Sequence, residues 1–73
     1  MKLQHFEQKE GYQFRLFFEN GEMKEADLQN LIGQYVDLVD LKTARIDTDW
    51  GCLEFKNGVV DIDPKTLYRY GNL

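Results

Sequence analysis

The phrase Phe-x-Asn-Gly occurs twice in this chain and constrains its fold more than any other feature. It stands at residues 18–21 and again at residues 55–58, each time between runs in which apolar and polar residues alternate. Asn-Gly between such runs is the strongest short-range signal of a β-hairpin, because both residues tolerate the positive φ angles of a type I′ turn. The sequence therefore predicts two hairpins, with turns at Asn20-Gly21 and Asn57-Gly58.

The strand before the first turn has a clear apolar face. By the period-two rule this face carries Tyr12, Phe14, Leu16 and Phe18. Phe17 is the exception, because it points to the opposite face. Residues 2–8 are predicted to form a strand of weaker pattern, and residues 22–26 return from the turn as a short partner strand.

Each hairpin is followed by a segment typical of a short helix. Asp27 is placed as an N-cap before apolar residues at helical spacing, and Asp63 is placed likewise before Pro64. Residues 36–42 contain apolar residues without a clean period. The apolar residues of the two helices are Leu28, Leu31, Ile32 and Tyr35 in the first, and Leu67 and Tyr68 in the second.

The second hairpin has a predictable register. Two-residue loops at Asn57-Gly58 and at Trp50-Gly51 would place every apolar pair on one face, as a correct register should. The cross-strand pairs predicted in this way are Phe55 with Val60, Glu54 with Asp61, Leu53 with Ile62, Thr48 with Leu53, Asp47 with Glu54, and Ile46 with Phe55.

These patterns predict an α+β fold: a single antiparallel sheet of five to six strands with two short helices on one face. The chain of 73 residues is expected to form one domain, residues 1–73, in two hairpin-plus-helix units at 2–35 and 43–70. A domain of this size buries only about 60% of its unfolded surface, so its core is modest.

Composition excludes several functional classes. The net charge of −4 argues against direct nucleic-acid binding, since phosphate-binding proteins carry a basic stripe. No segment is apolar enough for a signal peptide or a membrane span. With a single cysteine, Cys52, these features favour a reducing cytoplasm.

Catalytic residues are not evident, and we expect a protein that is not an enzyme and needs no cofactor. The chain has no serine, and its only conceivable thiol–imidazole pair is Cys52 with His5. A small packed residue and a surface imidazole are the simpler explanation of these two.

The predicted register gathers three carboxylates on the polar face, those of Asp47, Glu54 and Asp61. Like charges opposite one another are unfavourable. Such a row could bind a divalent cation or small ligand through oxygen atoms, or meet a basic patch on a partner. A solvated surface is the simpler interpretation.

Aromatic side chains outside the predicted core indicate a partner-binding surface. They are Phe17, Trp50, Tyr68 and Tyr70, and aromatic residues make up 14% of the chain. Aromatic residues are enriched at binding hot spots. Alternatively, Trp50 folds over the end of the sheet and the N-terminal strand covers Phe17.

Two blocks of the chain resemble the bacterial family called domain of unknown function 2442. Residues 14–28, FRLFFENGEMKEADL, resemble its first block. Residues 41–68 resemble the second, which ends in Asp-Ile-x-Pro-x-x-Leu-Tyr. The family commonly has tryptophan where this chain has Phe55, and often phenylalanine where it has Leu41.

The resemblance implies a context but no activity. Family members are small bacterial proteins, sometimes fused to a helix-turn-helix domain and often encoded beside another small protein. This implies an accessory domain, regulatory or of toxin–antitoxin type, whose partner is another small protein from a neighbouring gene. A homo-oligomer is also compatible with the sequence. Our leading expectation is protein–protein binding, and the alternative is binding of a small ligand or divalent metal.

Overall fold

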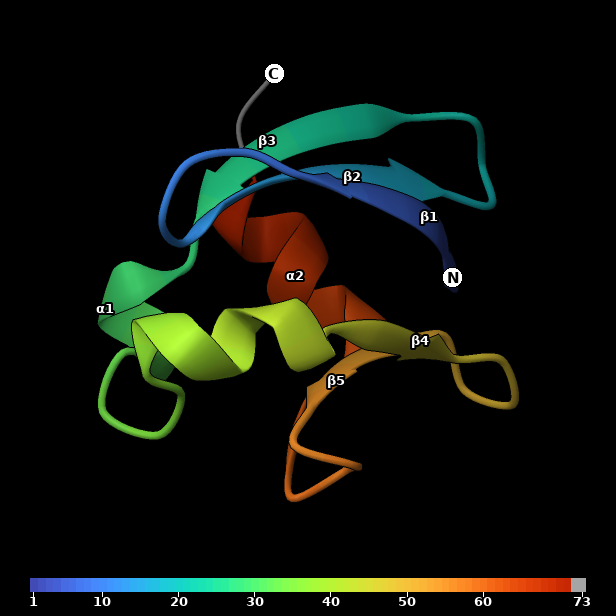
Figure 1. Ribbon diagram of the computed structural model, residues 1–73. Coiled ribbons are helices and arrows are strands. Elements are labelled where there is room, and N and C mark those ends of the chain that lie inside the picture. Colours follow the sequence, from blue (N-terminus) through green and yellow to red (C-terminus); the bar gives the residue numbers. More distant parts are fainter. Residues whose placement is uncertain (72–73) are drawn as a thin grey trace.

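The computed structural model describes residues 1–71 and contains two three-stranded antiparallel sheets with short helices (Figure 1). The first sheet has the order β1-β2-β3 and the second β4-β5-β6. The strands are β1 (Leu3–Gln8), β2 (Gln13–Phe18), β3 (Met23–Asp27), β4 (Arg45–Asp47), β5 (Cys52–Phe55) and β6 (Val60–Ile62). The helices are α1 (Gln29–Ile32), the 3-10 helix η1 (Leu38–Thr43) and α2 (Pro64–Tyr70). The α+β class is confirmed, but the single sheet of five to six strands is wrong.

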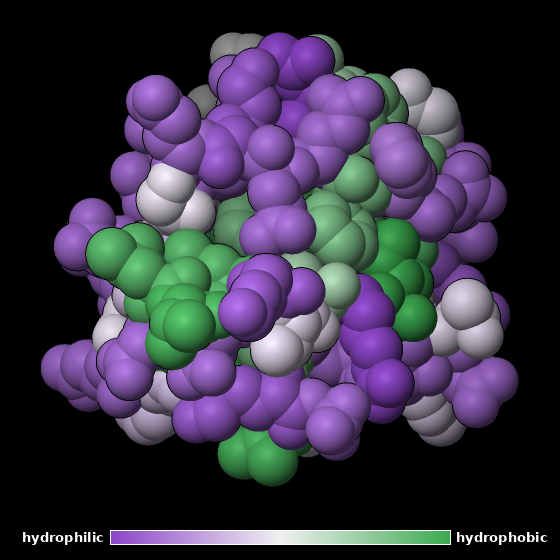
Figure 2. Space-filling view, viewed as in Figure 1, coloured by the Kyte–Doolittle hydropathy of each residue, from purple (hydrophilic) through white to green (hydrophobic). Residues whose placement is uncertain are grey.

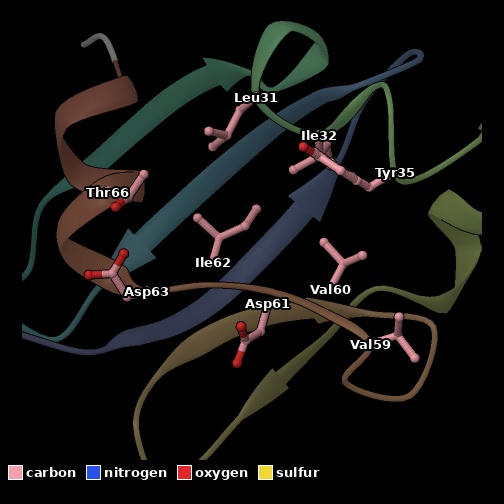
Figure 3. Close-up of a pocket in the computed structure, with 9 residues that line it drawn as sticks. All are labelled: Leu31, Ile32, Tyr35, Val59, Val60, Asp61, Ile62, Asp63 and Thr66. Atoms are coloured by element: carbon pink, nitrogen blue, oxygen red, sulfur yellow. The ribbon is translucent and has the colours of Figure 1, made fainter.

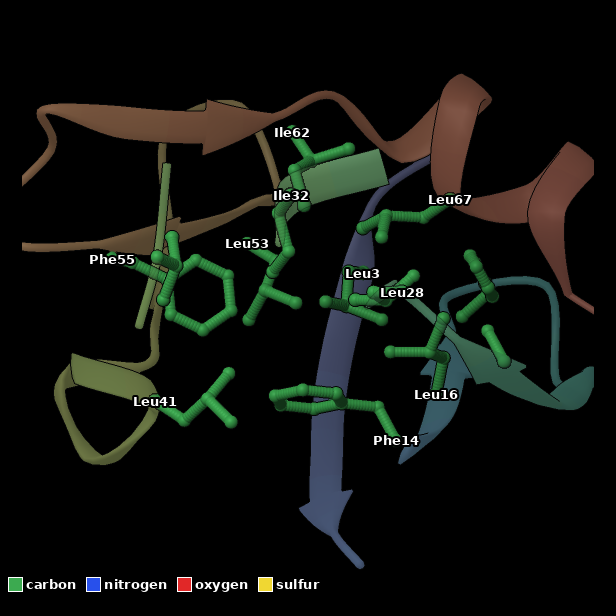
Figure 4. Close-up of a cluster of buried hydrophobic side chains, with 13 residues drawn as sticks. Leu3, Phe14, Leu16, Leu28, Ile32, Leu41, Leu53, Phe55, Ile62 and Leu67 are labelled. Atoms are coloured by element: carbon green, nitrogen blue, oxygen red, sulfur yellow. The ribbon is translucent and has the colours of Figure 1, made fainter. Parts of the chain in front are cut away.

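The two sheets share one apolar core. In Figure 1, α2 lies between the first sheet and the strands of the second. Phe14 of β2 and Phe55 of β5 meet edge to face in this core, with ring centroids 5.9 Å apart (Figure 4). An alternating pattern buries the same residues whether two sheets join edge to edge or face each other, so it could not separate the two arrangements. The buried core residues are Leu3, Phe14, Leu16, Phe18, Ala26, Leu28, Ile32, Val36, Leu41, Leu53, Phe55, Ile62 and Leu67.

The first hairpin forms where predicted, but its turn is of another type. The amide of Gly21 donates to the Phe18 carbonyl at 3.0 Å, and the Phe18 amide donates to Glu22 at 2.9 Å. Gly21 has a φ of 89°, whereas Asn20 is not among the residues with positive φ. A type I′ turn requires positive φ at both central residues, so that expectation is wrong here.

The register of the second hairpin is confirmed between β5 and β6. Leu53 faces Ile62, Glu54 faces Asp61 and Phe55 faces Val60. The turn begins one residue before Asn-Gly: Lys56 and Asn57 both have a φ of 57°.

The register predicted between β4 and β5 differs from the observed one by two residues, so that prediction is wrong. Arg45, not Asp47, faces Glu54, and Asp47 faces Cys52. The Gly51 amide donates to the Asp47 carbonyl, and Gly51 has a φ of 73°. A glycine in this conformation closes a longer loop as a bulge, so Trp50-Gly51 is not a two-residue turn.

The first helix, α1, is shorter than the apolar spacing suggested. α1 ends before Gly33, so Tyr35 lies beyond it. Residues 36–42, which had no clean period, contain η1, in which only Leu41 is buried. α2 begins at Pro64 as predicted. The prediction of Asp27 as N-cap is wrong: Leu28 occupies that position of α1, although the Asp27 carboxylate accepts a hydrogen bond from the Gln29 amide at 3.0 Å. Asp63 is the N-cap of α2 as predicted, but its side chain makes no capping hydrogen bond.

Candidate functional site

The four aromatic residues predicted to bind a partner differ in their surroundings. Trp50 lies on the β4–β5 loop and is 73% exposed, so it does not fold over the sheet. Phe17 is only half-buried and packs beside the His5 ring of β1, with centroids 5.3 Å apart. The N-terminal strand therefore covers part of Phe17. Tyr70, at the end of α2, is 38% exposed.

Tyr68 serves packing within the domain. Its ring meets Phe18 edge to face at 5.3 Å, and the Lys24 ammonium lies 3.7 Å from its centroid. Its hydroxyl donates to the Glu22 carboxylate at 2.7 Å, and this hydrogen bond raises the pKa of Tyr68 above its ordinary value. These contacts hold α2 against the β2–β3 hairpin.

The predicted row of three carboxylates is interrupted by the shifted register. Arg45 Nε donates to Glu54 Oε1 at 2.6 Å, in the place where Asp47 was expected. Asp61 still faces Glu54, while Asp47 lies opposite Cys52. Among residues 1–71, no group of three or more histidine, cysteine, aspartate or glutamate side chains could hold a metal ion.

Cys52 and His5 have separate structural surroundings. Cys52 is buried in β5, and burial raises the pKa of its thiol. A raised pKa keeps the thiol protonated and therefore a poor nucleophile. His5 is exposed, and its ring packs against that of Phe17 at a tilt of 38°.

An open groove of about 380 Å³ runs between β6 and the α1 region (Figure 3). Val60 and Ile62 point from β6 toward Leu31, Ile32 and Tyr35 on the other side, whereas Asp61 points away. The groove is lined by Leu31, Ile32, Tyr35, Val59, Val60, Asp61, Ile62, Asp63 and Thr66. Strand alternation produces this arrangement, because residues two apart on a strand share a face.

The charged side chains that line the groove, those of Asp61 and Asp63, are both acidic. Thr66, in the first turn of α2, faces Asp63 and holds the pKa of that carboxyl below its ordinary value. Asp61 is exposed. On the opposite side, Lys56 Nζ donates to the Tyr35 carbonyl at 3.1 Å, which ties the β5–β6 hairpin to the segment after α1.

Large apolar side chains are exposed in the segment after α1 and on the β5–β6 hairpin, and two of them, Tyr35 and Val59, line the groove. Tyr35 is 60% exposed, Leu38 66% and Val39 63%, and Val59 on the β5–β6 hairpin is 76% exposed. Figure 2 shows apolar surface over the start of η1 and at the tip of the hairpin below it. We call Tyr35, Leu38, Val39 and Val59 the α1–η1 surface. The sequence signal for it was the missing period in residues 36–42, since adjacent apolar residues cannot all face one core.

Within residues 1–71, no helix has the length and apolar character needed to cross a membrane. No curated protein and no solved structure matches this chain. The family described as "Protein of unknown function (DUF2442)" matches residues 5–72, nearly the whole chain. The chain therefore belongs to the DUF2442 family.

Proposed function

We propose that this domain acts by binding another small protein through the α1–η1 surface. The observation that carries the proposal is that three large apolar side chains, those of Tyr35, Leu38 and Val39, are each at least 60% exposed within five residues of chain. Single exposed apolar residues are common, but several large ones within one short segment are typical of an interaction site.

Tyr35 suits a hot spot because it stands beside a preformed groove. Interfaces concentrate their energy in a few apolar and aromatic anchors that are shielded from water on binding. Tyr35 offers a ring and a hydroxyl at the groove, and Val59 extends the apolar surface onto the hairpin.

The resemblance of this chain to proteins encoded beside another small protein supplies the candidate partner, the product of a neighbouring gene. The role that we propose is that of a regulatory accessory domain, with a toxin–antitoxin pair as the specific form. The aromatic residues that the sequence indicated for partner binding lie outside the α1–η1 surface. Tyr68 holds α2 in place, and Trp50 lies on the β4–β5 loop.

A small ligand is the second candidate, because the groove volume of about 380 Å³ falls in the range of small-molecule sites. Such sites bury most of their ligand, whereas this groove is open to solvent along β6. The openness favours a protein segment, which continues beyond the groove, over a small molecule.

The test is co-expression with the neighbouring gene product, followed by calorimetry on the purified proteins. The double variant Leu38→Ser/Val39→Ser should weaken binding by at least about tenfold, which corresponds to about 1.4 kcal/mol. Trp50→Ser is the matched control, because Trp50 is equally exposed but lies outside the α1–η1 surface. The absence of a complex, or loss of binding only in Trp50→Ser, would contradict the proposal.

A further inference from the structure

We infer that the free edge of β6 receives an extended partner segment as an added strand, and that this segment has the pattern apolar–basic–apolar. This inference rests on the proposed function and specifies how the partner is held. Addition of a strand to a sheet edge uses main-chain hydrogen bonds for affinity and alternate side chains for specificity.

The backbone of Asp61 faces outward from the sheet. The bulge at Gly51, whose amide donates to the Asp47 carbonyl, makes Asp47 and Cys52 a hydrogen-bonded pair. Residue pairs along an antiparallel ladder alternate between hydrogen-bonded and non-hydrogen-bonded pairs. The pair of Arg45 and Glu54, two residues along, is therefore hydrogen-bonded as well, and Glu54 turns its backbone N–H and C=O toward β4. Its neighbours Leu53 and Phe55 then turn theirs toward β6, as the hydrogen bond from the Gly58 amide to the Phe55 carbonyl at 3.2 Å also indicates.

It follows that Val60 and Ile62 bond to β5, while the N–H and C=O of Asp61 point away from it. No turn, loop or side-chain hydrogen bond among residues 1–71 uses these two groups of Asp61. An edge strand with an outward N–H and C=O is a template for a further strand. The groove lies along this edge, since residues 59–63 all line it.

The side-chain pattern of the added strand follows from the two faces of β6. A residue placed opposite Asp61 shares the face that carries Asp61 and Glu54, and its two neighbours point the other way (Figure 3). On that other side, Val60 and Ile62 face Leu31 and Tyr35. The neighbours of the central residue must therefore be apolar.

The central residue should be basic. The row across the sheet runs Arg45, Glu54, Asp61, and Arg45 is bonded to Glu54. Among residues 1–71, Asp61 has no cationic partner within salt-bridge distance, and it faces a like charge on Glu54. A lysine or arginine opposite Asp61 would form an ion pair with it, so that the charges across the strands would run positive, negative, negative, positive.

A second copy of this chain fits the edge less well. Two β6 strands paired about a two-fold axis at Asp61 would place the two Asp61 carboxylates opposite each other. The other edges are also less available: the Leu3 amide donates to the Gly51 carbonyl at 3.1 Å, which brings β1 against the β4–β5 loop. β3 is contacted by α2.

The probe is a short fluorescein-labelled peptide with valine-lysine-valine at its centre, compared with one that carries valine-glutamate-valine. By fluorescence anisotropy, the lysine peptide should bind the wild-type chain about tenfold more tightly. In Asp61→Lys the preference should reverse, whereas Asp49→Lys, the same change of charge at an exposed position of the β4–β5 loop, should keep the wild-type preference. Hydrogen exchange at the Asp61 amide should slow when the lysine peptide binds.

Several results would overturn the inference. One is an equal affinity for both peptides, or no affinity for either, while the neighbouring gene product still binds through Leu38 and Val39; the proposed function would then survive alone. Another is peptide binding that leaves exchange at the Asp61 amide unchanged. A concentration-dependent dimer that protects this amide without peptide would assign the edge to a second copy.

Discussion

Gly51→Ala tests the close contact between the β4–β5 loop and the start of the N-terminal strand β1. Gly51 is buried, and its carbonyl accepts a hydrogen bond from the Leu3 amide at 3.1 Å. A Cβ atom added at Gly51 would lie 2.4 Å from the Lys2 Cβ and 2.6 Å from the Lys2 Cα. These are backbone-level contacts, so the two segments would have to separate.

The magnitude has two parts. Gly51 has a φ of 73°, and an alanine in the left-handed region costs about 1–2 kcal/mol. Overpacking against Lys2 adds about 1–3 kcal/mol, for a total of about 2–5 kcal/mol. A domain of 73 residues is expected to have a free energy of unfolding of about 4–11 kcal/mol, so this loss is large.

Gly11→Ala is the matched control, because Gly11 has a φ of 58° but nothing within 4 Å of an added Cβ. Its free energy of unfolding should fall only by the cost of placing alanine in the left-handed region, about 1–2 kcal/mol. Urea unfolding followed by circular dichroism gives both free energies, provided that the slope with denaturant stays constant. Equal losses for the two variants would refute the close approach of Gly51 to Lys2.

Three further predictions concern the core, the thiol and a tyrosine. A double-mutant cycle of Phe14→Leu and Phe55→Leu, measured by urea unfolding, should show a coupling of about 0.5–1.5 kcal/mol from their edge-to-face contact; additive losses would contradict it. Cys52 should react slowly with a thiol reagent in the native protein and quickly in urea, because it is buried with a raised pKa; fast native reaction would contradict its burial. The raised pKa of Tyr68 favours the neutral phenol in the folded state, so its contribution to stability is full below the unfolded pKa and is lost as pH rises through the folded one. An NMR titration should show the pKa of Tyr68 falling toward its ordinary value in Glu22→Gln, and an unchanged pKa would exclude the hydrogen bond as the cause.

Local patterns were sufficient to predict most of the elements. The alternation in β2 identified the buried residues Phe14, Leu16 and Phe18, and Asp63-Pro64 marked the start of α2. The assembly of the hairpins was not predictable in this way, because a strand's pattern shows which face is buried but not what covers it. The sequence therefore suggested one sheet where the chain forms two around a shared core.

The candidate site was predictable only in part. Aromatic character alone could not distinguish Trp50, which is exposed, from Tyr68, which Phe18, Lys24 and Glu22 surround. Leu38 and Val39 belong to a segment whose apolar residues have no clean period, and η1 buries only Leu41. Exposure of this kind depends on tertiary packing, because Leu38 and Leu41 lie three residues apart on one side of a 3-10 helix and yet only Leu41 is buried.

The register of β4 shows where a stricter use of electrostatics would have helped. A shift of two residues keeps every side chain on its own face, so the hydrophobic pattern permits both registers equally. The two registers differ in charge: one places Asp47 opposite Glu54, and the other places Arg45 there, as the structure has it. Opposed carboxylates are unfavourable and an arginine–glutamate pair is favourable, so the like-charge row was itself an argument against the predicted register. The same charge argument applies to β6, where Asp61 lies opposite the like charge of Glu54. A basic residue on a strand added beside β6 would lie opposite Asp61, as Arg45 lies opposite Glu54.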